Sequence, residues 1–163
     1  MAKVEVGFSQ RGVLTTEDQK TYYAMVKYWE DQGSPGQDKP VVFSLRRLAK
    51  ILKKRWGTDV ITTLTQSLTR LYATPFFWTN SYYDIDTKKA VEEMEGFRIL
   101  DALKIIKTKQ DGHITKEAGY FKFNDYVLRN LLANHTKPLL LDVVLKFNSY
   151  FGPRQSVYQS ASL

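Results

Sequence analysis

Residues 44–73 constrain the fold more than any other stretch, because they predict two short helices joined by a turn. Ser44 is a good N-cap, since its hydroxyl can accept a hydrogen bond from a free N–H group of a first helical turn. Apolar residues then recur at i, i+3, i+4 and i+7, on one stripe of a helix: Leu45, Leu48, Ala49 and Leu52. Gly57 predicts the end of this helix, and Thr58 is expected to cap the next one.

The second helix of this stretch has an apolar side and a polar side. The apolar side is centred on Val60, Leu64, Leu68 and Leu71. The polar side carries hydrogen-bonding residues without an acid: Thr62, Thr63, Gln66, Thr69 and Arg70. Gln can pair with adenine, Arg can pair with guanine, and a Thr methyl group can contact that of thymine. These side chains are therefore predicted to read DNA bases, and an ordinary solvated helix face is the alternative interpretation.

Cationic residues are expected on both flanks of this helix. The first helix turns its basic residues away from the apolar stripe, which predicts phosphate contacts by Arg46, Arg47, Lys50, Lys53 and Lys54. Asp111 and Gly112 have the residue types of a tight hairpin turn. Lys104 and three further lysines surround the tip of this hairpin, which predicts a basic wing that lies along DNA phosphates. The three predicted phosphate ligands are Lys107, Lys109 and Lys116. The alternative is an edge hairpin whose lysines prevent aggregation.

The flanking segments complete an α+β pattern. A helix is expected from Thr16, with Gln19 closing a capping box, and another from Asn124 or Asp125 to Ala133. Strands are expected at 41–43, 76–83 and 97–108, with helix possible in the first half of the last, while 88–95 predicts a short helical or loop excursion. Pro138 begins either a buried strand or a short helix. The order of elements predicts a winged helix, a helix-turn-helix with a β-hairpin wing.

Three regions are expected along the chain. Residues 1–14 form an N-terminal arm with the alternation of an edge strand, and residues 15–148 form the winged-helix DNA-binding domain. Residues 149–163 contain Gly-Pro and four serines without periodicity, which predicts a flexible tail.

Composition favours a polyanionic partner and excludes several kinds of chemistry. Lys and Arg number 24 against 17 Asp and Glu, which gives a net charge of +7. The chain has no cysteine, its two histidines do not form a metal-spaced pair, and phosphate-binding or nucleophile motifs are absent. We therefore expect no metal, no cofactor, no catalytic residues and no enzymatic activity. Without an apolar run of membrane-spanning length or a signal peptide, a cytoplasmic protein with no membrane partner is expected.

Four stretches resemble the bacterial plasmid replication initiator protein A family: TTEDQKTYYAMVKYWED, FSLRRLAKILKKRWGT, LTQSLTRLYATPFFWTNSYYD and DGHITKEAGYFKFNDYVLRNLLANHTKPLLLD. The resemblance covers residues 14–148 and implies tandem winged-helix proteins that bind repeated sites at a plasmid origin. It also implies recruitment of host replication proteins and repression of the protein's own promoter as a homodimer. The family's recognition helix would fall on residues 58–72, and its phosphate-facing residues on the basic residues of the first helix.

The chain departs from this family after Phe147, where the family continues into a second winged-helix domain. The resemblance therefore implies the N-terminal domain alone, as a one-domain relative, a truncated copy or a regulator of an initiator. Two rival functions remain open. One is a stand-alone transcriptional repressor of the same fold. The other is a protein-interaction or dimerisation module that uses an exposed aromatic surface, such as part of Phe76, Phe77 and Trp78.

Overall fold

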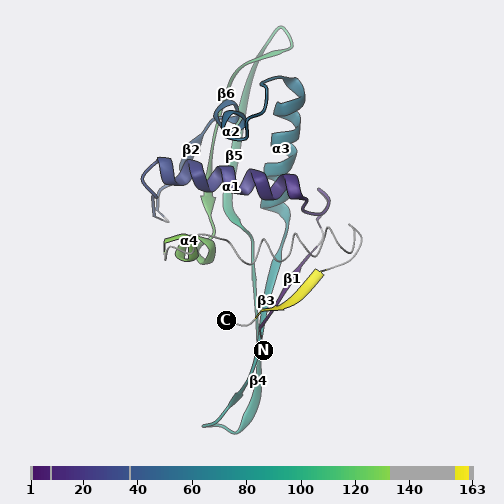
Figure 1. Ribbon diagram of the computed structural model, residues 1–163, viewed down its shortest axis with the longest axis vertical. Coiled ribbons are helices and arrows are strands. Elements are labelled where there is room, and N and C mark those ends of the chain that lie inside the picture. Colours follow the sequence, from purple (N-terminus) through teal and green to yellow (C-terminus); the bar gives the residue numbers. More distant parts are fainter. Residues whose placement is uncertain (1, 8, 37, 133–156, 162–163) are drawn as a thin grey trace.

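The computed structural model describes residues 2–7, 9–36, 38–132 and 157–161. It combines helices with antiparallel sheets, which confirms the expected α+β class (Figure 1). The helices are α1 (Thr16–Asp31), α2 (Leu45–Ile51), α3 (Thr58–Ala73) and α4 (Asp125–Leu132). The strands are β1 (Ala2–Val6), β2 (Val41–Phe43), β3 (Phe76–Asp84), β4 (Lys89–Phe97), β5 (Leu100–Gln110), β6 (His113–Phe123) and β7 (Val157–Ala161).

The strands form two sheets, with the orders β4-β3-β1-β7 and β2-β6-β5. The expected hairpin turn joins β5 to β6, where Gln110 pairs with His113. Asp111 and Gly112 both have positive φ, 51° and 77°, as a two-residue turn between twisted strands requires. The hairpins β3–β4 and β5–β6 extend to opposite ends of the long axis of the molecule (Figure 1).

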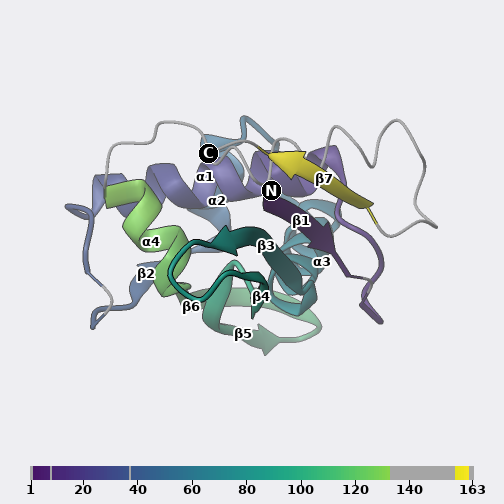
Figure 2. The same ribbon diagram turned by 90° about the horizontal axis from the view of Figure 1, so that it is seen from below.

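The core lies between the first three helices and the sheet β2-β6-β5. Leu48 of α2, Leu68 of α3 and Phe121 of β6 are fully buried in it, together with Met25 of α1. Helix α3 packs on α1 at one side and on β5 at the other (Figure 2). Gly119 is required in β6 because a Cβ there would stand 2.2 Å from the carbonyl oxygen of Lys104.

The expected caps of three helices need correction. The capping box of α1 joins Thr15 to Asp18 rather than Thr16 to Gln19. Helix α2 ends at Ile51, because Lys53 adopts a positive φ of 57° and the N–H of Lys54 bonds to the carbonyl of Ala49 at 2.9 Å, which closes a Schellman turn. Gly57, with an extended φ of 175°, is then the N-cap of α3 without a side-chain bond.

The expectation of a helical or loop excursion at residues 88–95 is wrong, because Lys89–Phe97 form strand β4, which pairs with β3. The N-terminal arm contains β1, which is not an edge strand, since β3 pairs with one side of it and β7 with the other. Within the expected tail, Val157–Ala161 form β7. The expectation for Pro138 falls outside the described residues.

Candidate nucleic-acid interface

Helix α3 exposes most of the predicted base-reading residues. Thr62, Thr63 and Gln66 are exposed, and Thr69 is half-buried. The hydroxyls of Thr62, Thr63 and Thr69 donate to carbonyl oxygens of their own helix at 2.9–3.2 Å, which leaves their oxygens able to accept hydrogen bonds. Asp59 is also exposed, one turn before Thr63, so this side of the helix carries an acid at its N-terminal end.

Arg70 is held against α1 and is largely buried. Its Nε donates to Oδ2 of Asp18 at 2.9 Å, and its Nη2 donates to Oδ1 at 2.8 Å. Asp18 is fully buried, and the Arg70 side chain is 20% exposed. The hydrogen bonds from Arg70 to Asp18 raise the pKa of the guanidinium above its ordinary value. This bidentate pair occupies the Nε–Nη2 edge of the guanidinium and holds the largely buried side chain against α1, so Arg70 supports the position of α3.

The Asp18 carboxylate organises the junction between α1 and α3. It also accepts from the N–H of Thr15 at 2.9 Å and from the Ser67 hydroxyl at 2.6 Å. Ser67 lies in turn 2.9 Å from the hydroxyl oxygen of Thr21. A buried carboxylate with this many donors stays satisfied without water, so the cluster fixes how α3 lies on α1.

The basic residues of α2 and its following turn divide into exposed and internally paired cations. Arg46 stacks over the ring of Trp56 and Arg47 over that of Tyr28, each at 5.1 Å, while both remain exposed. Lys50 and Lys53 are exposed and make no ion pair with a carboxylate of the described residues. Lys54 instead pairs with Glu17 at 3.1 Å. Its hydrogen bond is the main cause that lowers the pKa of Glu17, followed by that of Lys20.

The cations of the hairpin β5–β6 divide in the same way. Lys107 donates to the Thr65 hydroxyl of α3 at 2.8 Å, and burial lowers its pKa, with Lys109 nearby adding to the effect. Lys109 itself is exposed near the hairpin turn. Lys116 pairs with Thr108 through its backbone, and its side chain lies outside the description. Of the predicted phosphate ligands of the hairpin, Lys107 is thus bound to α3, and Lys109 is exposed.

Glu117 of β6 makes a structural contact with α2 that the sequence did not reveal. Its carboxylate accepts hydrogen bonds from the N–H groups of Leu45 and Arg46, at 2.5 and 3.0 Å. An acid at a helix N-terminus satisfies free N–H groups and the helix dipole. Glu117 therefore fastens the hairpin β5–β6 to α2, although it lies 72 residues from Leu45, a separation that no local pattern can show.

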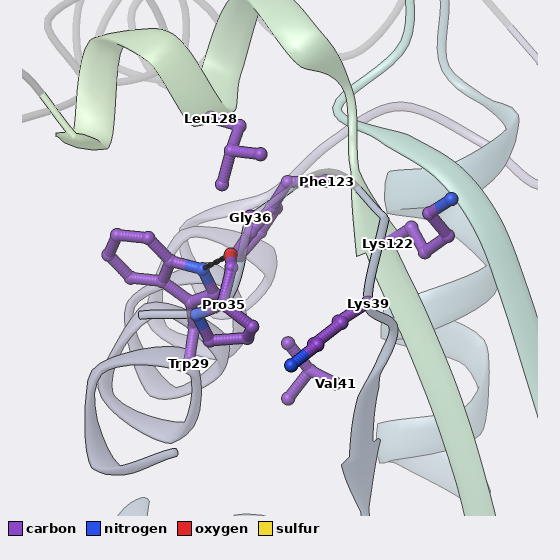
Figure 3. Close-up of a pocket in the computed structure, with 8 residues that line it drawn as sticks. All are labelled: Trp29, Pro35, Gly36, Lys39, Val41, Lys122, Phe123 and Leu128. Carbon is purple, nitrogen blue, oxygen red and sulfur yellow. Dashed lines mark hydrogen bonds between the residues drawn. The ribbon is translucent and has the colours of Figure 1, made fainter. Parts of the chain in front are cut away.

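A cavity near the C-terminal end of α1 is too small for an organic ligand. The cavity next to Trp29, Pro35 and Leu128 has a volume of about 10 Å³, room for at most one water molecule (Figure 3). The indole N–H of Trp29 donates to the carbonyl of Pro35 at 2.9 Å across it. Within the described ranges, His, Asp and Glu do not gather into a metal-binding group, and no helix is long and apolar enough to cross a membrane.

Comparisons with known proteins give a likeness in structure only. Neither a family model nor a curated protein sequence matches the chain. Two crystal structures of domains 2 and 3 of RctB resemble it, one with a TM-score of 0.69 at 16% identity and one with 0.67 at 14%. The match covers 92% and 94% of this chain but 60% and 61% of those structures. The chain shares their fold and spans less than two thirds of their length.

Proposed function

We propose that this chain is a non-enzymatic, winged-helix module that binds double-stranded DNA in a sequence-specific way, as part of a replication initiator-like protein. The order helix, strand, helix, helix and hairpin, with β2 paired to β6, supports the winged-helix interpretation. RctB is a replication initiator, and the sequence resemblance to plasmid initiators points to the same role. Such a protein acts on DNA in the cytoplasm.

One observation carries this proposal: the polar side of α3 is exposed while both of its flanks are fixed to other elements. Ser67 and Arg70 bind α1, and Thr65 binds the hairpin through Lys107. A rigid helix with exposed amide and hydroxyl groups needs little ordering when it enters a major groove. The α1 and hairpin contacts hold α3 in place and leave Gln66 outward.

The exposure and contacts of the individual side chains support the following proposed roles. In the proposed complex α3 reads bases through Thr62, Thr63, Gln66 and Thr69. Phosphates are held by exposed cations of α2, its following turn and the hairpin: Arg46, Arg47, Lys50, Lys53 and Lys109. Arg70 and Lys107 orient α3, and Lys54 is held by Glu17.

Sequencing of the DNA retained by the purified protein tests the proposal. We expect enrichment of one motif, and Gln66→Ala should bind that motif about 1–3 kcal/mol more weakly than the parent does, with relaxed preference at one position. A motif repeated in an origin indicates an initiator, whereas a single site in a promoter indicates a repressor of the same fold. Retention of random sequence, with Gln66→Ala unchanged, would contradict base reading by α3.

A second candidate function, dimerisation, is favoured by the hairpin β3–β4. Of the expected aromatic surface, Phe76 is buried and Phe77 is half-buried, and the side chain of Trp78 lies outside the description. Further along, Tyr83, Ile85 and Met94 are 63%, 80% and 69% exposed, and β4 is the edge of its sheet.

A second copy of this chain is the partner that this edge fits best. If two β4 strands pair antiparallel about Val91, Lys89 of each copy lies opposite Glu93 of the other, which gives opposite charges across the pair. Light scattering with and without duplex tests this. A dimer that Val91→Lys converts to a monomer supports the interface, and a parent that is monomeric at all concentrations contradicts it.

A further inference from the structure

The turn Ser9–Gly12, between β1 and α1, is tightly closed. The Ser9 hydroxyl accepts from the N–H of Arg11 and lies 3.1 Å from the carbonyl oxygen of Gly12, to which it donates. The N–H of Gly12 bonds to the carbonyl of Ser9 at 3.2 Å, and Gly12 adopts a φ of 96° that favours glycine. Gln10 and Arg11 are exposed at the tip. The hydrogen bonds of the turn therefore hold the backbone of Gln10 and Arg11 in one exposed conformation.

This turn is fixed beside the C-terminal end of α3. Before it, the N–H of Gly7 donates to the carbonyl of Pro75, two residues after α3, at 2.9 Å. After it, Leu14 is buried. A Cβ on Gly12 would lie 3.9 Å from Cδ of Arg70, so the turn contacts the last turns of α3. Figures 1 and 2 both show the loop between β1 and α1 beside α3 on the outer side of the molecule.

Charge at this end of α3 explains what the turn can do. The C-terminus of a helix is the negative end of its dipole and disfavours an approaching phosphate. Arg70, the basic residue of the last turn of α3, is neutralised by Asp18. Arg11 is exposed, and no carboxylate of the described residues pairs with it. Arg11 is therefore an available cation where a duplex on α3 would meet that negative end, as is exposed Arg98, which lies 5.5 Å over the ring of Tyr72.

We propose that the turn Ser9–Gly12 is a further DNA-binding element, in which the Arg11 guanidinium binds a backbone phosphate beside the groove that α3 occupies. The inference rests on the proposed DNA-binding function. Arg11 would hold the C-terminal end of α3 to the duplex, as Lys53 and Lys109 would from α2 and the hairpin. Arginine binds phosphate through two parallel hydrogen bonds, and the closed turn limits the entropy that this contact costs.

The test measures binding of the full chain to a random-sequence duplex by fluorescence anisotropy, between about 50 and 200 mM salt. Arg11→Ala should flatten the slope of log K against log salt by about 0.9 and weaken binding roughly five- to tenfold at the lower salt. Arg11→Lys should restore the slope, because it keeps the charge. Ser9→Ala should weaken binding a few-fold with the slope unchanged, since only the pre-ordering of the turn is lost.

Lys27→Ala is the matched control, because it removes one positive charge from the side of α1 opposite its buried face and should keep the parent slope. An Arg11→Ala protein with the parent slope, while Lys53→Ala flattens it, would overturn the inference and leave the proposed function standing. A parent that does not bind duplex at all would overturn both. A change of base preference in Arg11→Ala without a change of slope would replace the phosphate contact with base reading and so contradict the proposal.

Discussion

The hairpins β3–β4 and β5–β6 are the same kind of element with opposite surroundings. Residues 104–116, around the second turn, contain four lysines and one acid, whereas residues 81–96, around the first turn, contain five acids and two lysines. In β6, Phe121 and Phe123 enter the core, but β4 has no fully buried residue. The two ends of the long axis therefore differ in charge and in attachment (Figure 1).

Attachment explains why only one hairpin belongs to the candidate interface. The hairpin β5–β6 is fastened to α3 through Lys107 and to α2 through Glu117. Side chains of 81–96 are exposed apart from half-buried Asp84 and Val91. A polyanion would repel the negative hairpin β3–β4, so in the proposed complex this difference would orient the molecule on DNA. The proposed protein contact at β4 would then lie at the far end from the duplex.

The largest expected difference between the hairpins is in stability. Phe121→Ala should lower the free energy of unfolding by about 3–5 kcal/mol, because it removes a fully buried ring packed against Phe43 and Phe123. Met94→Ala, at a side chain that is 69% exposed, should change it by less than about 0.5 kcal/mol. Urea unfolding measures both, and equal losses would contradict the contrast in attachment.

The next largest effect on stability is expected at the contact of α3 with α1, on the other side of α3 from the hairpin β5–β6. Asp18→Ala should cost about 3 kcal/mol, because the Arg70 charge loses its partner and the Ser67 hydroxyl its acceptor, with a discount for the partial exposure of Arg70. Asp31→Ala is the matched control. It breaks the exposed pair with Lys27 and should cost about 0.5 kcal/mol or less.

Arg70→Ala separates the structural role from base reading. We expect reduced stability and an unchanged preferred DNA motif when binding is measured at a temperature where the variant is folded. If Arg70→Ala kept the stability of the parent but lost the preference for one base, Arg70 would be a base-reading residue. Its pair with Asp18 would then not be needed to hold α3 in place.

Local patterns sufficed for the elements that pack on the core. The spacing of Leu45, Leu48 and Ala49 predicted the buried stripe of α2, and the Ser44 hydroxyl accepts from the N–H of Arg47 as an N-cap should. Asp111-Gly112 predicted the turn of the basic hairpin. Each of these signals comes from residues a few positions apart, where geometry is set by the backbone itself.

The misses have long-range causes. Strand β4 shows no alternation because both of its faces are largely exposed, so its conformation is dictated by pairing with β3 rather than by its own pattern. Arg70 lies at the edge of the polar side of α3, and only its partner 52 residues away removes it from that surface. Thr62, Thr63 and Gln66 are exposed, as their position on the polar side of α3 predicts, because no described residue from a distant part of the chain covers them.

Charge substitution on the two hairpins should give a smaller but discriminating difference. Lys109→Ala, near the turn of β5–β6, should flatten the salt slope of DNA binding by about 0.9, as one lost phosphate contact does. Lys89→Ala removes the same charge from β4 at the other end and should keep the slope. Equal flattening in both would mean that net charge, rather than the position of the basic hairpin, governs binding.

The smallest effect concerns Lys54, which is paired with Glu17, whereas Lys50 and Lys53 are exposed without an ion pair among the described residues. The Lys54 and Lys20 hydrogen bonds lower the pKa of Glu17 below its ordinary 4.5, so the folded state binds its proton less tightly than the unfolded state does. This stabilisation is complete above that pH and is lost as the pH falls through the lowered pKa. Because the Glu17 side chain is 52% exposed, Glu17→Gln should cost about 0.5 kcal/mol or less at neutral pH.

The pH dependence of the stability difference between the parent and Glu17→Gln shows whether the ionised Glu17 causes it. In urea unfolding at a series of pH values, parent and Glu17→Gln curves should converge as the pH falls below 4.5, since protonated Glu17 and Gln are then equally uncharged. Glu17→Gln also frees Lys54, so its DNA salt slope should become slightly steeper than that of the parent. Curves that stay parallel at every pH would mean that the pair contributes nothing, and Lys54 would then count with Lys50 and Lys53 among the cations open to phosphate.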